Sequence, residues 1–411
     1  MADHLEELTR LVDTAGAEVV ARVSQQITAP NSATLIGEGK VEEVARAVAD
    51  TGASLVIFDE ELSPAQGVNL ERALEVRVMD RPEVILDIFS TRARSHEAKL
   101  QVELAQLEYL LPRLTRMWTH LSRIRGGIGL RGPGETQLET DRRIIRRRIQ
   151  GLKAKLKSVE RHRENLRSGR DPMLGVALVG YTNAGKSSIL RALSGQHEIF
   201  VEDRLFATLD TLTREVDLGE GQRARVTDSV GFIRKLPHHL VASFRATLEE
   251  VRSADLLLHI VDASHHDWEG QMRVVERVLA DLELNDRPLI PVFNKMDMVA
   301  DPEGFAKRVR ELHPGALTVS TMRTSGLAPL KAVLREKERA GRLTVRVRVP
   351  VADGARLAAL YRDGEVLSRE ENGAALEVTV RLDRWQVERL RREGVDVADA
   401  AVGGEVGRRA G

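Results

Sequence analysis

A glycine-rich segment near the middle of the chain constrains the fold more than any other feature. Residues 180–187, GYTNAGKS, fit the pattern G-x-x-x-x-G-K-[ST] at every fixed position. The apolar run 174–179 before it predicts a buried strand, and residues 188–193 after it predict a helix. A strand, a phosphate-binding loop and a helix in this order are typical of a P-loop α/β domain. The alternative, a chance glycine-rich turn, is disfavoured by the two flanks.

The chemistry of this loop follows from its backbone and two side chains. Glycines let main-chain N–H groups point into one concavity and bind phosphate oxygens, and the helix N-terminus adds partial positive charge. Lys186 is expected to contact the β- and γ-phosphates, and the Ser187 hydroxyl is expected to hold Mg²⁺. The candidate phosphate-binding residues are Gly180, Tyr181, Thr182, Asn183, Ala184, Gly185, Lys186, Ser187 and Ser188.

Two later segments extend the motif. The first, D-x-x-G, follows the apolar-alternating run 223–227. The carboxylate of Asp228 can hold the Mg²⁺ shell, and the N–H of Gly231 can donate to the γ-phosphate. The second, N-K-x-D, follows the apolar run 289–293. The order phosphate loop, D-x-x-G and N-K-x-D along the chain is that of a GTPase. The second segment alone also has a less favoured interpretation as a polar turn after a strand. The residues are Asp228, Ser229, Val230 and Gly231 in the first, and Asn294, Lys295, Met296 and Asp297 in the second.

The base specificity is predicted from one carboxylate. Asp297 can accept two hydrogen bonds from guanine N1–H and the 2-amino group. Adenine lacks that donor pair, so ATP would leave a buried acceptor unpaired at a cost of roughly 1–3 kcal/mol. A further loop, formed by Ser320, Thr321 and Met322, follows a predicted strand where a base-contacting loop is expected.

A switch segment between the phosphate loop and Asp228 should supply a threonine to Mg²⁺. We select Thr208 within the candidate switch I residues Phe206, Ala207, Thr208, Leu209 and Asp210, and Thr211 and Thr213 remain alternatives. Phe232 stands where Ras-like GTPases carry a glutamine that orients the attacking water. Hydrolysis therefore needs another group, a partner or a cation. The carboxamide of Asn183 is a candidate to help hold K⁺, and loop packing is the equal alternative.

Composition excludes several classes of protein. The chain has no cysteine, which rules out disulfides, thiolate zinc sites and a cysteine nucleophile. No segment approaches the roughly 18 apolar residues of a membrane span, and the first residues lack the pattern of a secretory signal. We expect a cytoplasmic monomer.

Charge is unevenly distributed along a chain whose net charge is zero. Residues 92–170 hold 20 Lys and Arg against 8 Asp and Glu, a net charge of +12. Such a block indicates a polyanionic partner, with a solvated arginine-rich pair of helices as the alternative.

The same block is predicted to form an antiparallel helical hairpin. Leucines at 100, 104, 107 and 111 share one helical face, and apolar residues from 145 to 166 keep a near-heptad spacing. Residues 117–138 between them are too glycine-rich for regular structure. An exposed basic tip on a rigid arm suits insertion into folded RNA, although a plain disordered connection is equally compatible. The candidate RNA-contacting residues are Arg123, Arg125, Arg131, Arg142, Arg143, Arg146 and Arg147.

The fold class predicted for the whole chain is α/β, with four folded parts and a tail. These are an N-terminal α/β subdomain (1–91), the basic hairpin (92–170), the GTPase domain (171–340), a small C-terminal α+β domain (341–398) and a disordered tail (399–411). Within the first part, residues 18–23, 54–58 and 76–79 are predicted strands, and residues 40–50 and 63–73 are predicted helices.

Taken together, these segments resemble HflX, a family of translation-factor-class GTPases in the Obg-HflX group. The marks are residues 126–143 (GGIGLRGPGETQLETDRR), 99–107 (KLQVELAQL), 33–43 (ATLIGEGKVEE) and 206–210 (FATLD). Ser229 departs from the usual D-T-V-G, Asp210-Thr211-Leu212 lacks the usual proline, and Ser320-Thr321 replaces the usual S-A.

The resemblance implies a function that the motifs alone do not give. HflX proteins bind the large ribosomal subunit, and some split stalled or idle ribosomes under stress. It implies that the hairpin tip reaches ribosomal RNA near the peptidyl transferase centre, that Ser187 and Thr208 hold Mg²⁺, and that ATP is a weaker substrate. It leaves two roles open: a GTP hydrolase that splits ribosomes, or a large-subunit assembly or hibernation factor that uses GTP as a timer.

Overall fold

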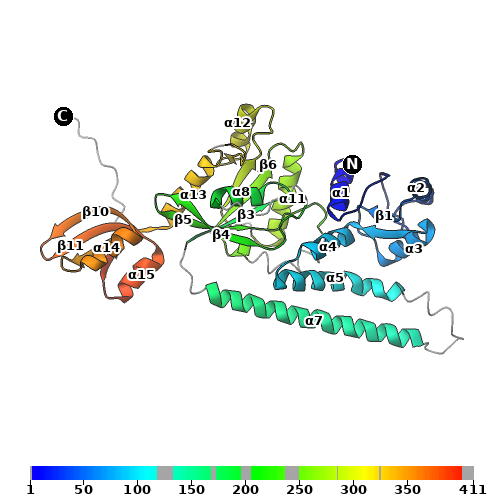
Figure 1. Cartoon of the computed structure of the whole chain (residues 1–411), viewed down its shortest axis with the longest axis horizontal. Helices are drawn as coiled ribbons and strands as arrows, with labels where there is room; N and C mark the ends of the chain where they lie inside the picture. Colours follow the sequence, from blue (N-terminus) through cyan, green and yellow to red (C-terminus); the bar gives the residue numbers. More distant parts are fainter. Residues whose placement is uncertain are drawn as a thin grey trace.

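The computed structural model describes residues 2–117, 133–167, 173–195, 205–236, 250–284, 286–323 and 325–399. Within these ranges the chain is a mixed α/β protein of four parts: three lie roughly in a row, and the fourth, the hairpin, runs along one side (Figure 1). None of the described helices is long and apolar enough to cross a membrane.

The N-terminal part is a layer of helices on a minimal sheet. Strands β1 and β2 pair in parallel, and Pro64 and Pro82 stand in the first turns of α3 and α4, where proline costs no hydrogen bond. Side-chain oxygens of Ser63 and Asp80 cap those two helices. The elements are α1 Ala2–Thr14, α2 Glu38–Thr51, β1 Leu55–Phe58, α3 Pro64–Leu74, β2 Arg77–Asp80 and α4 Arg81–Arg92.

One predicted strand is wrong. Residues 18–23 form an irregular segment between α1 and α2, and most of their side chains are exposed. Two of their valines are half-buried, since Val19 and Val23 pack against two different clusters. No strand in the described part of the chain pairs with this segment, so its apolar residues do not become a strand. Helices α1 and α4 were not predicted.

The hairpin consists of α5 His96–Met117 and α7 Pro133–Arg167, which lie side by side and antiparallel (Figure 1). Leu100, Leu104, Ile149 and Leu152 form its buried seam, as the spacing predicted. The tip is shorter than predicted, because α7 begins at Pro133, and proline is favoured in a first helical turn. Residues 118–132 lie outside the described ranges.

The third part is a six-stranded sheet in the order β4-β5-β3-β6-β7-β8, in which only β4 is antiparallel. The apolar runs 174–179, 223–227 and 289–293 that precede the three motifs form β3, β5 and β7. The carboxyl ends of β3, β6 and β7 meet at one edge, where a ligand crevice is expected in an open parallel sheet. The elements are β3 Leu174–Gly180, α8 Lys186–Ser194, β4 Leu212–Gly219, β5 Gln222–Asp228, β6 Leu256–Asp262, α11 Trp268–Asp281, β7 Leu289–Asn294, α12 Pro302–Leu312, β8 Leu317–Thr318 and α13 Ala328–Gly341.

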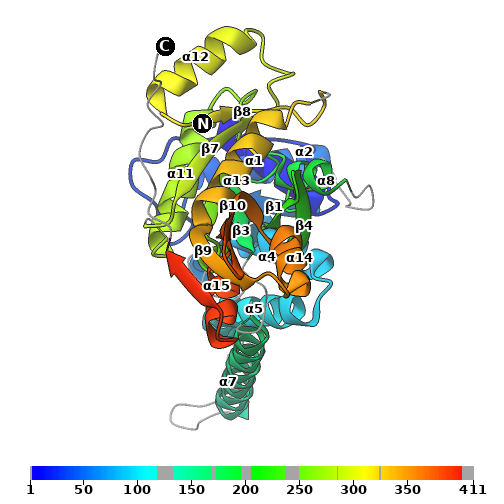
Figure 2. The same cartoon turned by 90° about the vertical axis from the view of Figure 1, so that its left-hand side faces the viewer.

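The C-terminal part is a four-stranded antiparallel sheet in the order β10-β11-β9-β12. It begins almost directly after α13 and lies at the opposite end of the molecule from the N-terminal part (Figure 1), the end that faces the viewer in Figure 2. Alternate valines of β9, at 345, 347 and 349, are fully buried. Its elements are β9 Leu343–Pro350, α14 Gly354–Asp363, β10 Glu365–Asn372, β11 Ala375–Leu382, α15 Arg384–Arg392 and β12 Asp396–Asp399. Elements α14, β10 and β12 were not predicted, and residues 400–411 lie outside the described ranges.

Candidate active site

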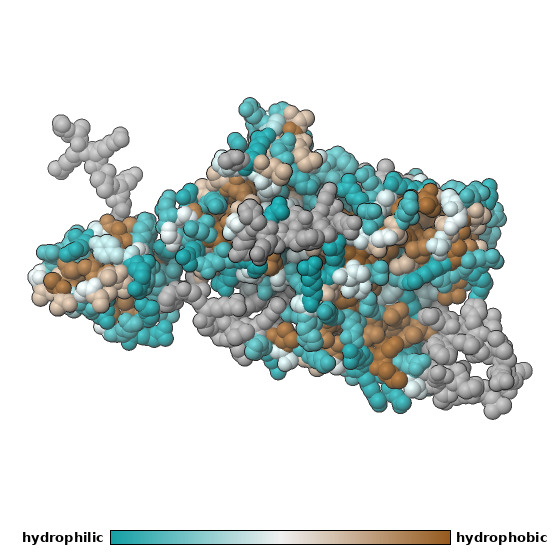
Figure 3. Space-filling model, in the orientation of Figure 1, coloured by the Kyte–Doolittle hydropathy of each residue, from teal (hydrophilic) through white to brown (hydrophobic). Residues whose placement is uncertain are grey.

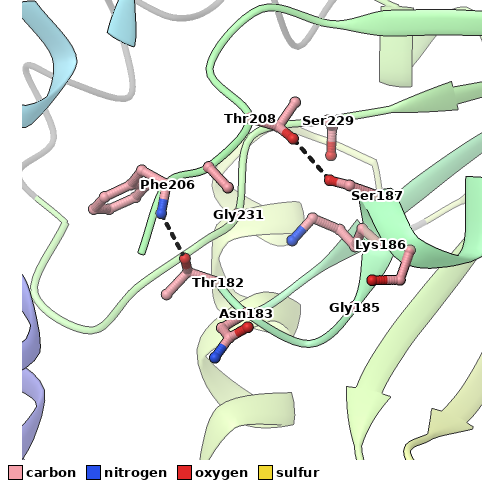
Figure 4. Close-up of a pocket in the computed structure, with 11 residues that line it drawn as sticks. Thr182, Asn183, Gly185, Lys186, Ser187, Phe206, Thr208, Ser229 and Gly231 are labelled. Atoms are coloured by element: carbon pink, nitrogen blue, oxygen red, sulfur yellow. Dashed lines mark hydrogen bonds between the residues drawn. The ribbon is translucent and has the colours of Figure 1, made fainter. Parts of the chain in front are cut away.

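The phosphate loop lies between β3 and α8, as the motif predicts, and lines a pocket with residues of two other segments (Figure 4). A Cβ atom at Gly185 would come within 2.3 Å of the Asn294 side-chain nitrogen, and the φ of Gly185 is 93°. Only glycine tolerates both conditions. The residues that line the pocket are Thr182, Asn183, Gly185, Lys186, Ser187, Ser188, Phe206, Ala207, Thr208, Ser229 and Gly231.

Lys186 is buried, and its ammonium points into this pocket. Nζ donates to the carbonyl oxygens of Gly180 (3.2 Å) and Tyr181 (2.9 Å). Burial lowers the pKa of Lys186 to about 8, and the charge of Asp228 opposes that shift. A bound phosphate would add negative charge beside the ammonium and favour its protonated form.

Three oxygen-bearing side chains converge beside the lysine. The Ser187 hydroxyl lies 2.7 Å from the Thr208 hydroxyl and 2.6 Å from Asp228 Oδ2, and Thr208 Oγ1 lies 3.1 Å from the same carboxylate oxygen. Asp228 Oδ1 is buried without a hydrogen-bond partner in the described part of the chain. Burial raises the pKa of Asp228, opposed by Lys186. Hard oxygen ligands and an unpaired buried carboxylate oxygen fit Mg²⁺.

Of the three threonines considered for switch I, only Thr208 is placed here. The Thr213 hydroxyl instead bonds Thr227 (2.9 Å) and Glu250 (3.1 Å), on the β4–β5 side of the sheet. Phe206 and Leu209 are buried, and the Phe206 N–H donates to Thr182 Oγ1 at 3.0 Å (Figure 4).

The segment after β5 packs tightly under the phosphate loop. A Cβ atom at Gly231 would come within 2.6 Å of Thr182 Cα, so glycine is required. The Ser229 hydroxyl donates to the Leu178 carbonyl at 2.6 Å, and Val230 is buried in the core. Phe232 is buried as well, and its backbone bonds Gly180 and Thr182. An apolar, buried side chain at 232 cannot orient a water molecule.

The N-K-x-D segment lies at the end of β7 and contacts the phosphate loop. Asn294 Nδ2 donates to the Ala184 carbonyl at 3.1 Å, and Lys295 pairs with Asp262 at 2.7 Å. The Met296 side chain is buried. The Asp297 carboxylate accepts a short hydrogen bond from the Ser320 hydroxyl, which fixes its direction. Sequence reasoning gave Ser320 only a weak role, and this contact makes it the support of Asp297.

The rest of the predicted base-contacting loop is more open. The Met322 N–H donates to Ser320 Oγ at 3.2 Å, which closes a tight turn. Thr321 is half-buried, and the Met322 side chain is 80% exposed. The side chain of Met322 is therefore accessible beside the expected position of the base.

A contact that sequence reasoning missed joins the phosphate loop to the N-terminal part. The Tyr181 hydroxyl donates to Glu7 of α1 and accepts from the backbone N–H of Arg234 at 2.9 Å. Burial raises the pKa of Tyr181, and the Glu7 charge adds to this effect. Glu7 also pairs with the buried Arg81. No sequence pattern links residues so far apart along the chain.

The predicted RNA-contacting arginines divide into two groups. Arg143, Arg146 and Arg147 are exposed on α7, and Arg142 is half-buried. Arg123, Arg125 and Arg131 lie outside the described residues. Figure 3 shows hydrophobic and hydrophilic surface mixed over this side of the molecule. On the hairpin helices themselves, Leu110 and Ile144 are 42% and 56% exposed. The described part of the hairpin thus presents arginines to solvent on one helix.

Three family models match successive parts of the chain. The N-terminal region of GTP-binding GTPases matches residues 2–90, their middle region matches residues 92–170, and the 50S ribosome-binding GTPase family matches residues 175–295.

Curated relatives match over most of the length. The chain is 43% identical over 390 residues to the GTPase HflX of Escherichia coli strain K12, covering 93% of this chain and 91% of the relative. It is 51% identical over 297 residues to the GTPase HflX of Flavobacterium psychrophilum, covering 72% and 71%. Among solved structures, a GTP-binding protein from the archaeon Sulfolobus solfataricus in complex with GDP is 23% identical with a TM-score of 0.43, covering 81% of this chain and 95% of that one. Identity at this level across nearly the whole chain shows that it belongs to the HflX family of GTPases.

Proposed function

We propose that this protein is a Mg²⁺-dependent GTP hydrolase that acts on ribosomes. The observation that carries the catalytic part is the convergence of Ser187, Thr208 and Asp228 oxygens beside Lys186. A Mg²⁺ ion held by Ser187 and Thr208 would neutralise charge on the β- and γ-phosphates. Asp297, held by Ser320, would select guanine over adenine, with ATP as a weaker substrate.

Turnover without a partner should be slow. Phe232 offers no group to orient water, so we expect a basal rate on the order of 10⁻⁴–10⁻² per second. Asn183 lines the phosphate pocket, and we propose it as a K⁺-binding contact that assists hydrolysis. Phosphate release measured in potassium and in sodium salts tests that contact. Equal rates in the two salts would remove K⁺ from the proposal and leave the GTPase assignment intact.

The proposed partner is the large ribosomal subunit. Exposed arginines of α7 lie in the segment of net charge +12, and phosphate contacts by arginine make affinity fall steeply with salt. The matching family is described as ribosome-binding. We infer that the hairpin contacts ribosomal RNA, near the peptidyl transferase centre, and that GTP binding is used to split or rescue stalled or idle ribosomes.

The alternative role is an assembly or hibernation factor with GTP as a timer, which the apolar Phe232 favours through slow hydrolysis. Sedimentation of joined ribosomes with the protein and GTP separates the two roles. Conversion to free subunits supports splitting. Stable binding to large subunits without loss of joined ribosomes supports the timer and contradicts splitting.

A charge-matched pair of variants tests the hairpin. Arg143, Arg146 and Arg147 changed to Ser should weaken ribosome binding and flatten its salt dependence, with GTP binding intact. The control changes Arg346, Arg348 and Arg392, which are exposed in the C-terminal part, to Ser. Co-pelleting at two salt concentrations is the measurement. Equal weakening by both variants would contradict a specific role of the hairpin.

A further inference from the structure

The switch I segment is buried against the N-terminal part of the molecule. Leu205, Phe206 and Leu209 are 5%, 1% and 2% exposed, and they belong to a core that also contains residues of α4 and α5. Thr208, which stands between these anchors, is the residue whose hydroxyl reaches Ser187 and Asp228. Buried residues before and after Thr208 in the sequence therefore fix the position of its hydroxyl.

Phe206 forms the first anchor. Its backbone N–H is bound to Thr182 of the phosphate loop, and its ring meets the ring of Phe89 in α4 edge-to-face at 4.8 Å. Its φ is 55°, a left-handed conformation that a non-glycine residue keeps only where the surrounding packing enforces it. One residue thus joins the phosphate loop to α4.

Asp210 forms the second anchor. Its carboxylate accepts the backbone N–H groups of Arg94 (3.0 Å) and Ser95 (3.2 Å) and a short hydrogen bond from the Ser95 hydroxyl. Ser95 Oγ in turn accepts the N–H of Ala98 at 3.0 Å, in the first turn of α5. A carboxylate at this end of a helix also complements the helix dipole. Asp210 therefore holds switch I to the first turn of the hairpin.

We propose that Phe206 and Asp210 are positioning residues: by binding α4 and the start of α5, they hold Thr208 beside Ser187 and Asp228. The orientation of the hairpin is thereby coupled to the position of a proposed Mg²⁺ ligand. This inference rests on the proposed GTPase function. Thr208 would be held in place only while α5 keeps its orientation. Nucleotide that engages Thr208 should therefore stabilise the first turn of α5. By linkage, the factor by which nucleotide changes the affinity for a partner that shifts the hairpin equals the factor by which that partner changes the affinity for nucleotide.

The first test is hydrogen exchange in the full-length protein. We expect a non-hydrolysable GTP analogue with Mg²⁺ to slow exchange in residues 94–99 several-fold relative to GDP, because GDP has no γ-phosphate to order switch I. Asp210→Ala should abolish that difference. Residues 343–350 of β9 serve as an internal reference that nucleotide should not change. Equal exchange at 94–99 in the two nucleotide states of the wild type would overturn the proposal.

The second test is kinetic. Asp210→Ala and Ser95→Ala should each lower GTP turnover about tenfold, the effect of losing charge-assisted hydrogen bonds, and raise the Mg²⁺ concentration needed, with GDP affinity within about twofold of wild type. Asp210→Asn, which keeps an acceptor, should retain most of the turnover. The matched control is Asp217→Ala, since Asp217 binds only the nearby Gly219 N–H at 2.8 Å among the bonds described.

The outcomes separate this inference from the function on which it rests. A wild type that fails to hydrolyse GTP contradicts the proposed function. If the wild type hydrolyses GTP and the Asp210→Ala and Ser95→Ala variants show the same rate and the same Mg²⁺ dependence, only the positioning role is overturned. Thermal melting identifies a variant that has merely unfolded, and Ser95→Ala, which removes a single hydroxyl, then decides.

Discussion

The two ends of this molecule are attached to the GTPase domain in different ways. On the N-terminal side, Leu11 of α1 and Ile85 of α4 share one apolar core with Val179 of β3 and Val275 of α11. On the C-terminal side, β9, β11 and the helices around them close a core of their own. Packed side chains therefore connect the N-terminal side to the sheet that carries the nucleotide site, whereas the C-terminal core contains no residue of the GTPase domain among those described.

The joint on the C-terminal side is short and polar. Arg342 is the single residue between α13 and β9, and it pairs with Glu338 at 2.6 Å and Asp383 at 3.6 Å. Apolar packing makes two parts unfold as one unit, whereas a polar joint allows separate unfolding. We expect two unfolding transitions, with the nucleotide site in the larger one.

The largest expected effect comes from one leucine on each side of this comparison. Leu11 and Leu382 are 0% and 1% exposed, and truncation of either to alanine should cost about 2–5 kcal/mol. Leu11→Ala should lower the transition that GTP stabilises, and Leu382→Ala should lower the other. Calorimetry with and without GTP measures both. A single transition shifted equally by the two variants would break the comparison.

The next effect concerns base selection. Asp297→Asn should weaken GTP binding about 10- to 100-fold, from the loss of two hydrogen bonds to guanine, and should let xanthosine triphosphate compete. Asp383→Asn, at the C-terminal joint, is the control and should leave nucleotide affinity unchanged. Competition binding checks both. Unchanged GTP affinity in the Asp297 variant would remove Asp297 from base recognition.

A smaller effect follows from the pKa of Lys186, which burial lowers to about 8. Bound phosphate favours the charged ammonium, so above pH 8 GTP binding must take up a proton, and affinity should fall by up to about tenfold per pH unit. Binding heats in buffers of different ionisation enthalpy report that uptake. The stability of the nucleotide-free protein should change with pH in the opposite direction. Between pH 8 and 10.5 the unfolded chain binds more protons at Lys186 than the folded chain, so the free energy of unfolding rises with pH over that range. An affinity independent of pH from 7 to 9.5 would contradict the assignment.

The smallest effect uses a buried histidine of β6. Burial lowers the pKa of His259 to about 4 from 6.5, with the Lys186 charge adding to the shift. Between those values the unfolded chain binds the extra proton, so this contribution to stability is lost as pH falls from 6.5 to 4. His259→Gln should flatten that dependence in the larger transition. Residues 343–399 contain no histidine, so the C-terminal transition should be unaffected by the substitution.

Local patterns predicted local structure well. The phosphate loop, the strands of the central sheet and the buried seam of the hairpin each follow from spacing within a short segment. That residues 18–23, with Val19 and Val23, form an irregular segment and not a strand was not predictable. Strand formation depends on a partner strand, which no local pattern reports. The bonds from Asp210 to Ser95 and from Tyr181 to Glu7 join segments far apart in the sequence, so only the folded chain brings them together.

The shared core also has a consequence for how the chain is made. Leu8, Leu11 and Val12 precede their later partners in the same cluster, Val275 and Leu284, by more than 250 residues of chain. At about 5–20 residues per second, their last partners leave the ribosome roughly 15 to 50 seconds later. During that interval the apolar face of α1 has no complete surface to cover it, and binding by a chaperone that shields nascent apolar segments would aid folding. The C-terminal part, whose core comes entirely from residues 345–397, has no such delay.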